Sequence, residues 1–268
     1  MYQNTITLPN GTQAPMLALG TWLIPDDIAA EAVKQAINIG YRHIDTAQAY
    51  GNERGVGEGV RASGIDRGEI FVTSKVMAEY KSYDIAAESI NESLKTSGLD
   101  YFDLMLIHCP QPWDEFGGEN RYFAENRQVW RALEEAYNDG KVKAIGVSNF
   151  NEADIENILS SAEIKPMVNQ IPCFIGRTQT ELIDYCKAQG IVLEAYSPIA
   201  HGDALNDGRI AQYASKYGVT VPQFCIKYDL QLGMITLPKT TKPCRMRENA
   251  DLDFVISDED MAVLMKMQ

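Results

Sequence analysis

The chain has 268 residues, of which 45% are hydrophobic, 9% aromatic and 23% charged. This composition is typical of a folded globular protein, and the length suits one closed α/β barrel, which commonly needs about 250 residues. Acidic residues outnumber basic ones by 37 to 24, which gives a formal net charge of −13. A field of this sign repels phosphate backbones and anionic lipids, so neither nucleic acid nor a membrane surface is an expected partner.

Patterns for export, membrane insertion and metal binding are missing from the sequence. The segment Met1–Thr5 shows no cationic stretch that leads into an apolar one, and no window approaches the ~18 apolar residues of a membrane span. The five cysteines form no C-x-x-C pair, and the three histidines lack H-E-x-x-H spacing. We therefore expect a cytoplasmic protein without a catalytic metal or a disulfide framework. The lack of an obvious exposed apolar stripe favours a monomer.

The first fifteen residues differ from the rest of the chain. Two short β-rich runs, Thr5–Leu8 and Thr12–Pro15, flank Pro9-Asn10-Gly11, and this arrangement predicts a β-hairpin with an Asn-Gly turn. We expect residues 1–15 to cap one end of a single domain that spans residues 1–268. Strand-like and helix-like segments alternate through residues 16–268 without a low-complexity linker, which is typical of βα units.

Eight strand candidates follow the predicted hairpin. They are Leu17–Thr21, Arg42–Thr46, Phe71–Lys75, Phe102–His108, Ala144–Asn149, Met167–Ile171, Val192–Ser197 and Met234–Pro238. Segments of helical periodicity separate them, such as Ala29–Ile37 before Gly40, and a last helix is expected at Ser257–Met267. Eight parallel strands with intervening helices predict a single-domain (β/α)8 TIM barrel of the α/β class, with the hairpin as its N-terminal cap.

A doubly wound sheet is the structural alternative to a barrel. It would need a G-x-G-x-x-G turn for phosphate binding, and this turn is absent. The nearest match, Gly55-Val56-Gly57-Glu58-Gly59, has the wrong third spacing and does not directly follow a strand. We interpret these glycines as a surface for tight helix packing.

Polar residues stand at the C-terminal ends of three consecutive strand candidates, where barrels of this kind carry their reactive groups. They are Asp45, with Tyr50 five residues later, then Lys75, then His108. Singly, each is compatible with a loop cap or a solvated residue, but an acid, a phenol, an ammonium and an imidazole at one pocket mouth suit proton transfer. We expect the Lys75 ammonium, held by Asp45, to lower the pKa of Tyr50, and a neutral His108 to polarise a carbonyl oxygen.

Four stretches around these residues, Gly40–Glu53, Thr73–Lys75, Leu106–His108 and Gly146–Phe150, form a recognisable set. With Gly20-Thr21-Trp22 before them and Glu248-Asn249 after them, they resemble the aldo-keto reductase family over nearly the whole chain. The bacterial diketogluconate-reductase and prostaglandin-F-synthase-like branches look most similar. The resemblance implies a (β/α)8 barrel and NAD(P)H-dependent reduction of aldehydes and ketones by hydride transfer from the nicotinamide. It also implies Tyr50 as the proton donor, Asp45 and Lys75 as its tuning pair, and His108 as the donor that orients the carbonyl group.

Later strand ends are suited to a nicotinamide, which needs polar groups for its carboxamide and a flat surface for its ring. Ser148, Asn149 and Gln170 can bond the carboxamide and Tyr196 can lie beneath the ring, as the resemblance also implies. The structural alternative is that these residues cap the strands and fill the core. We also assign other strand-end residues to the cofactor site, namely Gly20, Thr21, Trp22, Asp45, Ser197, Leu237 and Pro238.

One short segment reverses the charge balance of the chain. Residues 239–247 hold four cations and no acid, whereas the other 259 residues hold 20 cations and 37 acids. Such a run is usually a solvated face, but cations beside the hydroxyls of Thr240 and Thr241 at the phosphate-binding end of a barrel suit a dianionic phosphate. The resemblance places Lys239, Thr240 and Arg245 on the 2′-phosphate of NADPH. It places Glu248 and Asn249 on the adenine. We therefore expect NADPH rather than NADH.

The substrate pocket is expected to have an aromatic rim suited to partly apolar carbonyl compounds. We expect the substrate to contact Trp22, Tyr50, His108 and Trp113, with Phe116 and Tyr122 nearby, although part of the rim is compatible with simple packing. The sequence departs from the family pattern at Cys109 and at Gln170–Phe174, and neither change touches the four reactive residues. It also stops soon after the last predicted helix, without the long C-terminal loop that closes the pocket in animal members of the family, and we therefore expect an open pocket with broad specificity.

Two other functions fit part of the pattern. A cofactor-binding regulatory module of the same fold would bind NADPH with little turnover, and it would normally carry an added partner-binding segment, of which none is visible. A phosphate-sugar isomerase on the same barrel would need a strand-end glutamate as its base. The only candidate, Glu194, lies inside the seventh predicted strand, so we favour the reductase.

Overall fold

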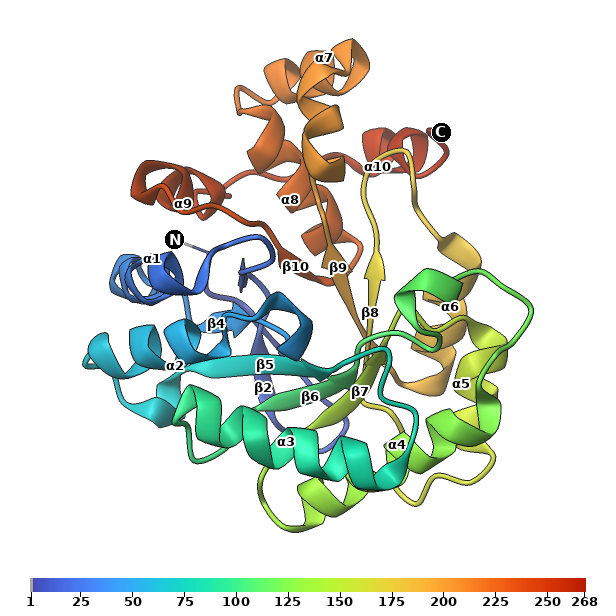
Figure 1. Cartoon of the computed structure of the whole chain (residues 1–268). Helices are drawn as coiled ribbons and strands as arrows, with labels where there is room; N and C mark the ends of the chain where they lie inside the picture. Colours follow the sequence, from blue (N-terminus) through green and yellow to red (C-terminus); the bar gives the residue numbers. More distant parts are fainter. Residues whose placement is uncertain (1) are drawn as a thin grey trace.

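Eight parallel strands form the centre of the computed structural model, which describes residues 2–268 (Figure 1). Each strand pairs with the next one along the chain. The strands are β3 (Leu19–Gly20), β4 (His43–Asp45), β5 (Phe71–Val76), β6 (Leu104–Ile107), β7 (Ile145–Ser148), β8 (Val168–Pro172), β9 (Val192–Tyr196) and β10 (Ile235–Leu237). The order confirms the predicted (β/α)8 barrel.

The barrel is closed between its first and last strands. The backbone N–H of Ala18 donates to the carbonyl oxygen of Thr236 at 3.0 Å, and that of Gly20 donates to Pro238 at 3.1 Å. Position 20 favours glycine, because a Cβ atom there would lie 3.1 Å from the carbonyl oxygen of Leu237, a tight contact. The closure brings the ends of β3 and β10 side by side, although more than 200 residues separate them.

Six of the eight strands end one residue before the predicted boundary. Two of these ends have a backbone cause: Asn149 and Ser197 have φ angles of 63° and 56°. This left-handed conformation turns the chain out of the pleated strand. The turns leave the side chains of the last strand residues at the rim of the barrel.

Helices surround the strands on the outside of the barrel (Figure 1). They are α1 (Asp26–Ile39), α2 (Glu53–Ala62), α3 (Tyr83–Ser97), α4 (Phe123–Asn138), α5 (Glu152–Leu159), α6 (Thr180–Gln189), α7 (Gly208–Lys216), α8 (Val221–Gln231), α9 (Pro243–Asn249) and α10 (Asp258–Leu264). Four short 3-10 helices lie in loops: η1 (Gln48–Tyr50), η2 (Arg67–Glu69), η3 (Trp113–Glu115) and η4 (Ala200–Asn206). Within residues 2–268, no helix is long and apolar enough to cross a membrane.

Helix α10 is shorter than the predicted Ser257–Met267. Ser257 is the N-cap rather than the first helical residue, because its side chain accepts a hydrogen bond from the backbone N–H of Asp260. In contrast, α1 ends where predicted, since Gly40 adopts a φ of 123° and its N–H bonds back to the carbonyl of Ala36.

The glycines of α2 confirm the predicted packing surface. A Cβ atom on Gly55, Gly57 or Gly59 would lie 2.2, 1.9 or 2.5 Å from a backbone carbonyl oxygen of Asp26, Ser97 or Ala30, respectively. These contacts bring α2 against the start of α1 on one side and the end of α3 on the other. The glycines therefore serve helix contact and bind no phosphate in the manner of a doubly wound fold.

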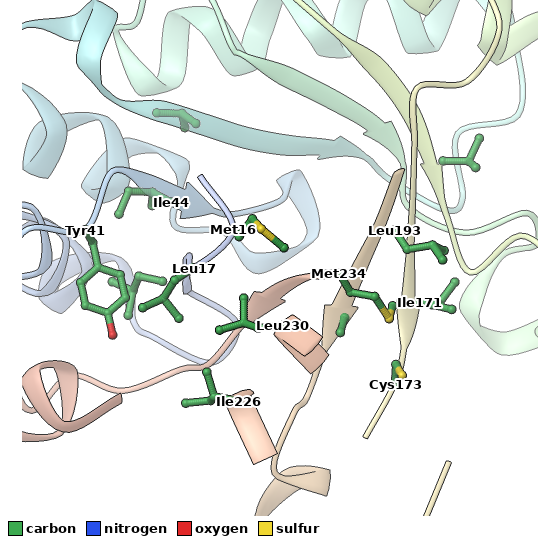
Figure 2. Close-up of a cluster of buried hydrophobic side chains, with 14 of the residues drawn as sticks. Met16, Leu17, Tyr41, Ile44, Ile171, Cys173, Leu193, Ile226, Leu230 and Met234 are labelled. Carbon is green, nitrogen blue, oxygen red and sulfur yellow. The ribbon is translucent and has the colours of Figure 1, made fainter. Parts of the chain in front are cut away.

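The core has two parts. The larger cluster fills the space between the strands and the helices, and Figure 2 shows a section of it in which Ile226 and Leu230 of α8 lie among side chains from the barrel wall. The smaller cluster lies inside the barrel and includes Phe71, Leu104 and Ile235. Because strand side chains alternate between the two faces, strands β5, β6 and β8 contribute to both clusters.

The N-terminal hairpin closes one end of the inner cluster. It consists of β1 (Thr5–Thr7) and β2 (Gln13–Pro15), which pair antiparallel around the predicted turn. Leu8 and Ala14 are buried in the inner cluster, against residues such as Phe71 and Leu104 that begin their strands. The hairpin is thus the predicted cap. The predicted segment, residues 1–15, begins with Met1, which lies outside the described residues.

Candidate active site

Lys75 is the centre of a hydrogen-bonded cluster at the opposite end of the barrel. Its Nζ lies 2.8 Å from Oδ1 of Asp45, 2.8 Å from the carbonyl oxygen of Thr46 and 3.3 Å from the hydroxyl of Tyr50. The side chain comes from β5, is fully buried and uses all three of its N–H groups. The barrel therefore brings three of the four predicted reactive residues into direct contact.

Electrostatics in this cluster differ in one respect from the sequence prediction. Burial by itself lowers the pKa of Lys75, but the charge of Asp45 and the contact with Tyr50 outweigh it and raise that pKa, so the ammonium stays charged. We expected the pKa of Tyr50 to be lowered, and this prediction is wrong, because the net shift is upward. Burial of the phenol raises its pKa, and the opposing charge of Lys75 only partly offsets this. Tyr50 is therefore a protonated phenol beside a fixed cation.

His108 follows β6 and faces the same cluster. Its ring lies edge-on to Tyr50, with centroids 5.5 Å apart, and edge-on to Trp113 at 5.2 Å. Burial and the nearby Lys75 charge hold the pKa of His108 well below its usual value, so the imidazole is neutral. Within residues 2–268, its buried Nδ1 has no hydrogen-bond partner.

The predicted nicotinamide residues form a second hydrogen-bonded group beside the first. The Tyr196 hydroxyl donates to Oδ1 of Asn149 at 2.8 Å, and Nδ2 of Asn149 donates to the carbonyl oxygen of His108 at 3.0 Å. The Ser148 hydroxyl donates to the carbonyl oxygen of Gln170 at 3.0 Å. These bonds hold neighbouring strand ends together, which is the structural role that the sequence left open.

Gln170 connects the two groups. Its Nε2 donates to Oδ2 of Asp45 at 2.9 Å and to Oε2 of Glu194 at 2.8 Å. The site thus extends from Tyr50 through Lys75 and Asp45 to Gln170 and, below it, to Glu194 inside the barrel.

The basic segment 239–247 lies beyond the end of β10 and includes most of α9. Helix α9 packs beside α1, where the Tyr41 hydroxyl donates to the carbonyl oxygen of Met246 at 2.9 Å. Lys239 and Arg245 are exposed, whereas Thr240 is buried and accepts a hydrogen bond from the backbone N–H of Lys242. Within the described part of the chain, none of the four cations forms an ion pair.

Aromatic side chains stand exposed around the cluster. Trp22, Trp113 and Phe116 are 45%, 42% and 49% exposed, and Trp113 packs edge-on to Phe116 at 5.8 Å. Tyr122, also expected in the rim, has its hydroxyl bonded to Glu115 in the same loop. The structure therefore places Trp113 beside the neutral His108 and Phe116 beside Trp113.

Two residues near the site were missed or set aside in reading the sequence. His201, in the loop after β9, packs edge-on to Trp22 at 5.5 Å, and no sequence pattern indicates this contact. Glu194 was considered only as an isomerase base and set aside, although strand alternation puts it on the same barrel face as Tyr196. Across residues 2–268, no group of three or more His, Cys, Asp or Glu side chains is arranged to hold a metal ion.

Comparisons with known proteins agree with this geometry. The model of the "Aldo/keto reductase family" matches residues 16–268. A glyoxal reductase of Bacillus subtilis (strain 168) is 46% identical over 261 residues, which cover 97% of this chain and 91% of the relative. A 9,11-endoperoxide prostaglandin H2 reductase of Trypanosoma cruzi is 39% identical, with 96% and 89% covered. The crystal structure of an aldo/keto reductase from Brucella melitensis matches with a TM-score of 0.91 at 36% identity, over 99% of this chain and 100% of that one. The chain therefore belongs to the aldo/keto reductase family, whose members act on small-molecule carbonyl compounds and generally use nicotinamide cofactors.

Proposed function

We propose that this protein reduces aldehydes and ketones to alcohols with NADPH, and that Tyr50 donates the proton. The observation that carries the proposal is the buried Lys75 ammonium, which contacts both the Asp45 carboxylate and the Tyr50 hydroxyl. Burying an ion pair of this kind costs desolvation free energy, and a phenol held 3.3 Å from its ammonium is positioned for proton transfer.

The residues present fit a nicotinamide dinucleotide. Amide and hydroxyl groups stand at the ends of β7 and β8, the Tyr196 ring is half-buried beside them, and exposed cations follow β10. When bound, such a cofactor supplies the hydride, which no side chain can provide. Ser148, Asn149, Gln170 and Tyr196 would hold the nicotinamide end.

Tyr50 carries the proton in the proposed reaction. Its raised pKa keeps the hydroxyl protonated at neutral pH, so the O–H can donate to the oxygen of a carbonyl group as hydride reaches the carbon. The proton transfer leaves a phenolate, and the adjacent Lys75 ammonium stabilises the negative charge at the moment it forms. Asp45 keeps Lys75 charged and in place.

His108 would orient the carbonyl group. A neutral imidazole has one N–H to donate, and burial together with the Lys75 charge keeps the ring neutral. A protonated ring would instead add a second cation beside Lys75. The edge-on contacts of His108 with Tyr50 and Trp113 fix the plane of the imidazole ring. The direction in which its N–H donates is therefore set before a substrate arrives.

The basic segment is proposed to select NADPH over NADH. Lys239 and Arg245 are exposed cations; Lys239 precedes α9, and Arg245 lies in the first turn of that helix. A 2′-phosphate supplies the charge that this segment lacks, and Arg and Lys form strong charge-assisted hydrogen bonds to phosphate. The rest of the cofactor set proposed from the sequence, including Glu248 and Asn249 near the adenine, belongs to the same hypothesis.

Broad substrate specificity is part of the proposal. The exposed Trp22, Trp113 and Phe116 form an apolar rim rather than a closed pocket. Two relatives are named for reducing glyoxal and a prostaglandin endoperoxide, molecules of very different size. Comparable turnover of unrelated aldehydes and ketones would support the proposal, and marked selectivity for one compound would contradict it. The single domain, the monomeric state and the cytoplasmic location stay predictions.

NADPH oxidation by the purified protein, measured against a panel of carbonyl compounds, tests the reaction directly. Tyr50→Phe removes only the hydroxyl, so kcat should fall by about 10³-fold while NADPH still binds. Tyr213→Phe, in α7, is the matched control and should retain activity. Full activity of Tyr50→Phe would overturn the mechanism, and tight NADPH binding without turnover by the unchanged protein would point to a regulatory module.

A further inference from the structure

Glu194 lies in the middle of β9, inside the barrel, where charged residues are rare. It pairs in register with Gln170 of β8 and Ile235 of β10, and its side chain is fully buried. Strand alternation puts it on the same interior face as Tyr196, one layer below the proposed active site. A carboxyl group at such a position requires a physical reason.

The polar contacts of Glu194 lead directly to the active site. Its Oε2 accepts a hydrogen bond from Nε2 of Gln170, and that same nitrogen donates to Oδ2 of Asp45. Asp45 in turn holds Lys75, and Lys75 contacts Tyr50. A single amide group therefore joins the buried carboxyl group to the proton-transfer cluster.

The two hydrogen bonds determine how the Gln170 amide is oriented. An amide nitrogen has two hydrogens, and here each of them has a carboxyl oxygen as its acceptor. The amide oxygen then points away from both carboxyl groups, and an oxygen facing the Asp45 carboxylate would replace a hydrogen bond by repulsion. Without Glu194, only Asp45 would hold the amide, and one N–H would be buried without a partner.

The remaining groups around Glu194 are His43 and Asp45 from β4 and Lys75 from β5. The Nδ1 of His43 lies 3.0 Å from the carbonyl oxygen of Pro15, which can only accept, so this nitrogen carries the hydrogen. Burial lowers the pKa of His43 to about 4, so the ring is neutral. Its Nε2 is 4.0 Å from Oε1 of Glu194, too far for a hydrogen bond, and the contact is not an ion pair.

Charge balance is consistent with a neutral Glu194. Burial raises its pKa to about 8, and the charge of Asp45 adds to this effect. The interior then contains one carboxylate, Asp45, and one ammonium, Lys75. An ionised Glu194 would be a second negative charge without a second cation.

We propose that Glu194 is a positioning residue for the nicotinamide site: its carboxyl group holds the Gln170 amide so that the amide oxygen, turned away from both carboxyl groups, is the recognition atom for a carboxamide. The inference rests on the proposed function, because it gives Gln170 a nicotinamide to recognise. Glu194 itself contacts neither substrate nor cofactor.

Ligand binding by the protein without substrate provides the main test. Glu194→Leu keeps the volume but removes the acceptor, so the Kd for NADP+ should rise about 10-fold. The Kd for adenosine 2′,5′-bisphosphate, which lacks the nicotinamide, should stay within about 2-fold. Equal weakening of both ligands, or of neither, would overturn the proposal. Asp229→Asn is the control, because Asp229 is also a fully buried carboxyl group, but within residues 2–268 its side-chain hydrogen-bond partner is Thr236 and no residue of the cluster.

Glu194→Gln keeps an acceptor oxygen and removes the ionisation. It should retain NADP+ affinity within about 2-fold, and a loss as large as that of Glu194→Leu would contradict the positioning role.

Because the folded-state pKa of Glu194 is raised, its contribution to stability is present below about pH 4.5 and is lost as the pH rises through about 8. Urea unfolding of the cofactor-free protein should therefore show Glu194→Gln gaining stability over the unchanged protein between pH 5 and 8. If the free energies of unfolding of the two proteins changed in parallel with pH, Glu194 would not be the buried, neutral group inferred above. A failure of the proposed cofactor site would look different, because the unchanged protein would then bind neither ligand, and a failure of the proposed reaction alone would leave both Kd values of the unchanged protein intact.

Discussion

Two sets of cations in this protein are held in opposite ways. Lys75 is fully buried, and each of its N–H groups already has a partner within the barrel. The cations of segment 239–247 lie largely in solvent, without an ion pair within residues 2–268. The first set is organised by the fold before any ligand arrives, whereas the second lacks its counter-charge. The difference indicates that the proton-transfer cluster is preorganised and that the phosphate site is completed by its ligand.

The largest expected effect comes from removing the buried cation. Lys75→Met should lower kcat by about 10³-fold, because the phenolate formed at Tyr50 loses its stabilising charge. It should also lower the free energy of unfolding by about 3–5 kcal/mol, since the Asp45 carboxylate stays buried without its ion pair. Steady-state kinetics and urea unfolding measure the two effects separately.

Lys81→Met is the control for this substitution. Lys81 donates to the carbonyl oxygens of Cys109 and Pro110 and to Oδ1 of Asn126, and burial lowers its pKa to about 8. It resembles Lys75 in having three partners but lies outside the cluster. It should lose stability with a far smaller change in kcat. Similar losses of kcat in both variants would remove the distinction between a functional and a structural buried lysine.

A second prediction concerns the pH dependence of stability, which buried groups should dominate. The pKa of His43 is lowered to about 4 in the folded state, from 6.5 when exposed. Because this pKa is lowered on folding, the neutral ring contributes about 3 kcal/mol to the free energy of unfolding above pH 6.5. This contribution is lost as the pH falls towards 4. Urea unfolding should show the unchanged protein losing this amount relative to His43→Gln between pH 7 and 4. An exposed-site variant, Arg245→Ala, should follow the unchanged protein throughout.

The smallest expected effect is at the exposed cations. Lys239→Ala and Arg245→Ala should each raise the Kd for NADPH by about 10-fold and leave the Kd for NADH and kcat nearly unchanged. Fluorescence titration with both cofactors measures this selectivity. Arg209→Ala removes an exposed cation that is already paired with Asp207 and should change neither Kd. If neither cation affects the NADPH Kd selectively, the phosphate assignment is wrong.

Sequence patterns predicted the order of elements better than their edges. Short β-rich runs of apolar residues located all eight strands, because burial on both faces of a parallel sheet leaves nearly continuous apolar segments. The same patterns overestimated most strand ends by one residue, since nothing in the local sequence shows that Asn149 and Ser197 adopt a left-handed backbone. The glycines of α2 were interpreted correctly from their spacing, although the carbonyl groups that they contact come from other helices.

The sequence by itself determined the barrel, the family resemblance and the identity of the polar residues at the strand ends, because these depend on residue type and spacing along the chain. Only the tertiary structure decided how those residues affect one another. The Tyr50 pKa rises rather than falls, because the burial that opposes Lys75 exists only once the barrel has closed. Glu194 is connected to the active site through Gln170 and Asp45, from strands far apart in sequence. Burial and contacts between distant strands are properties of the folded chain, and no local pattern records them.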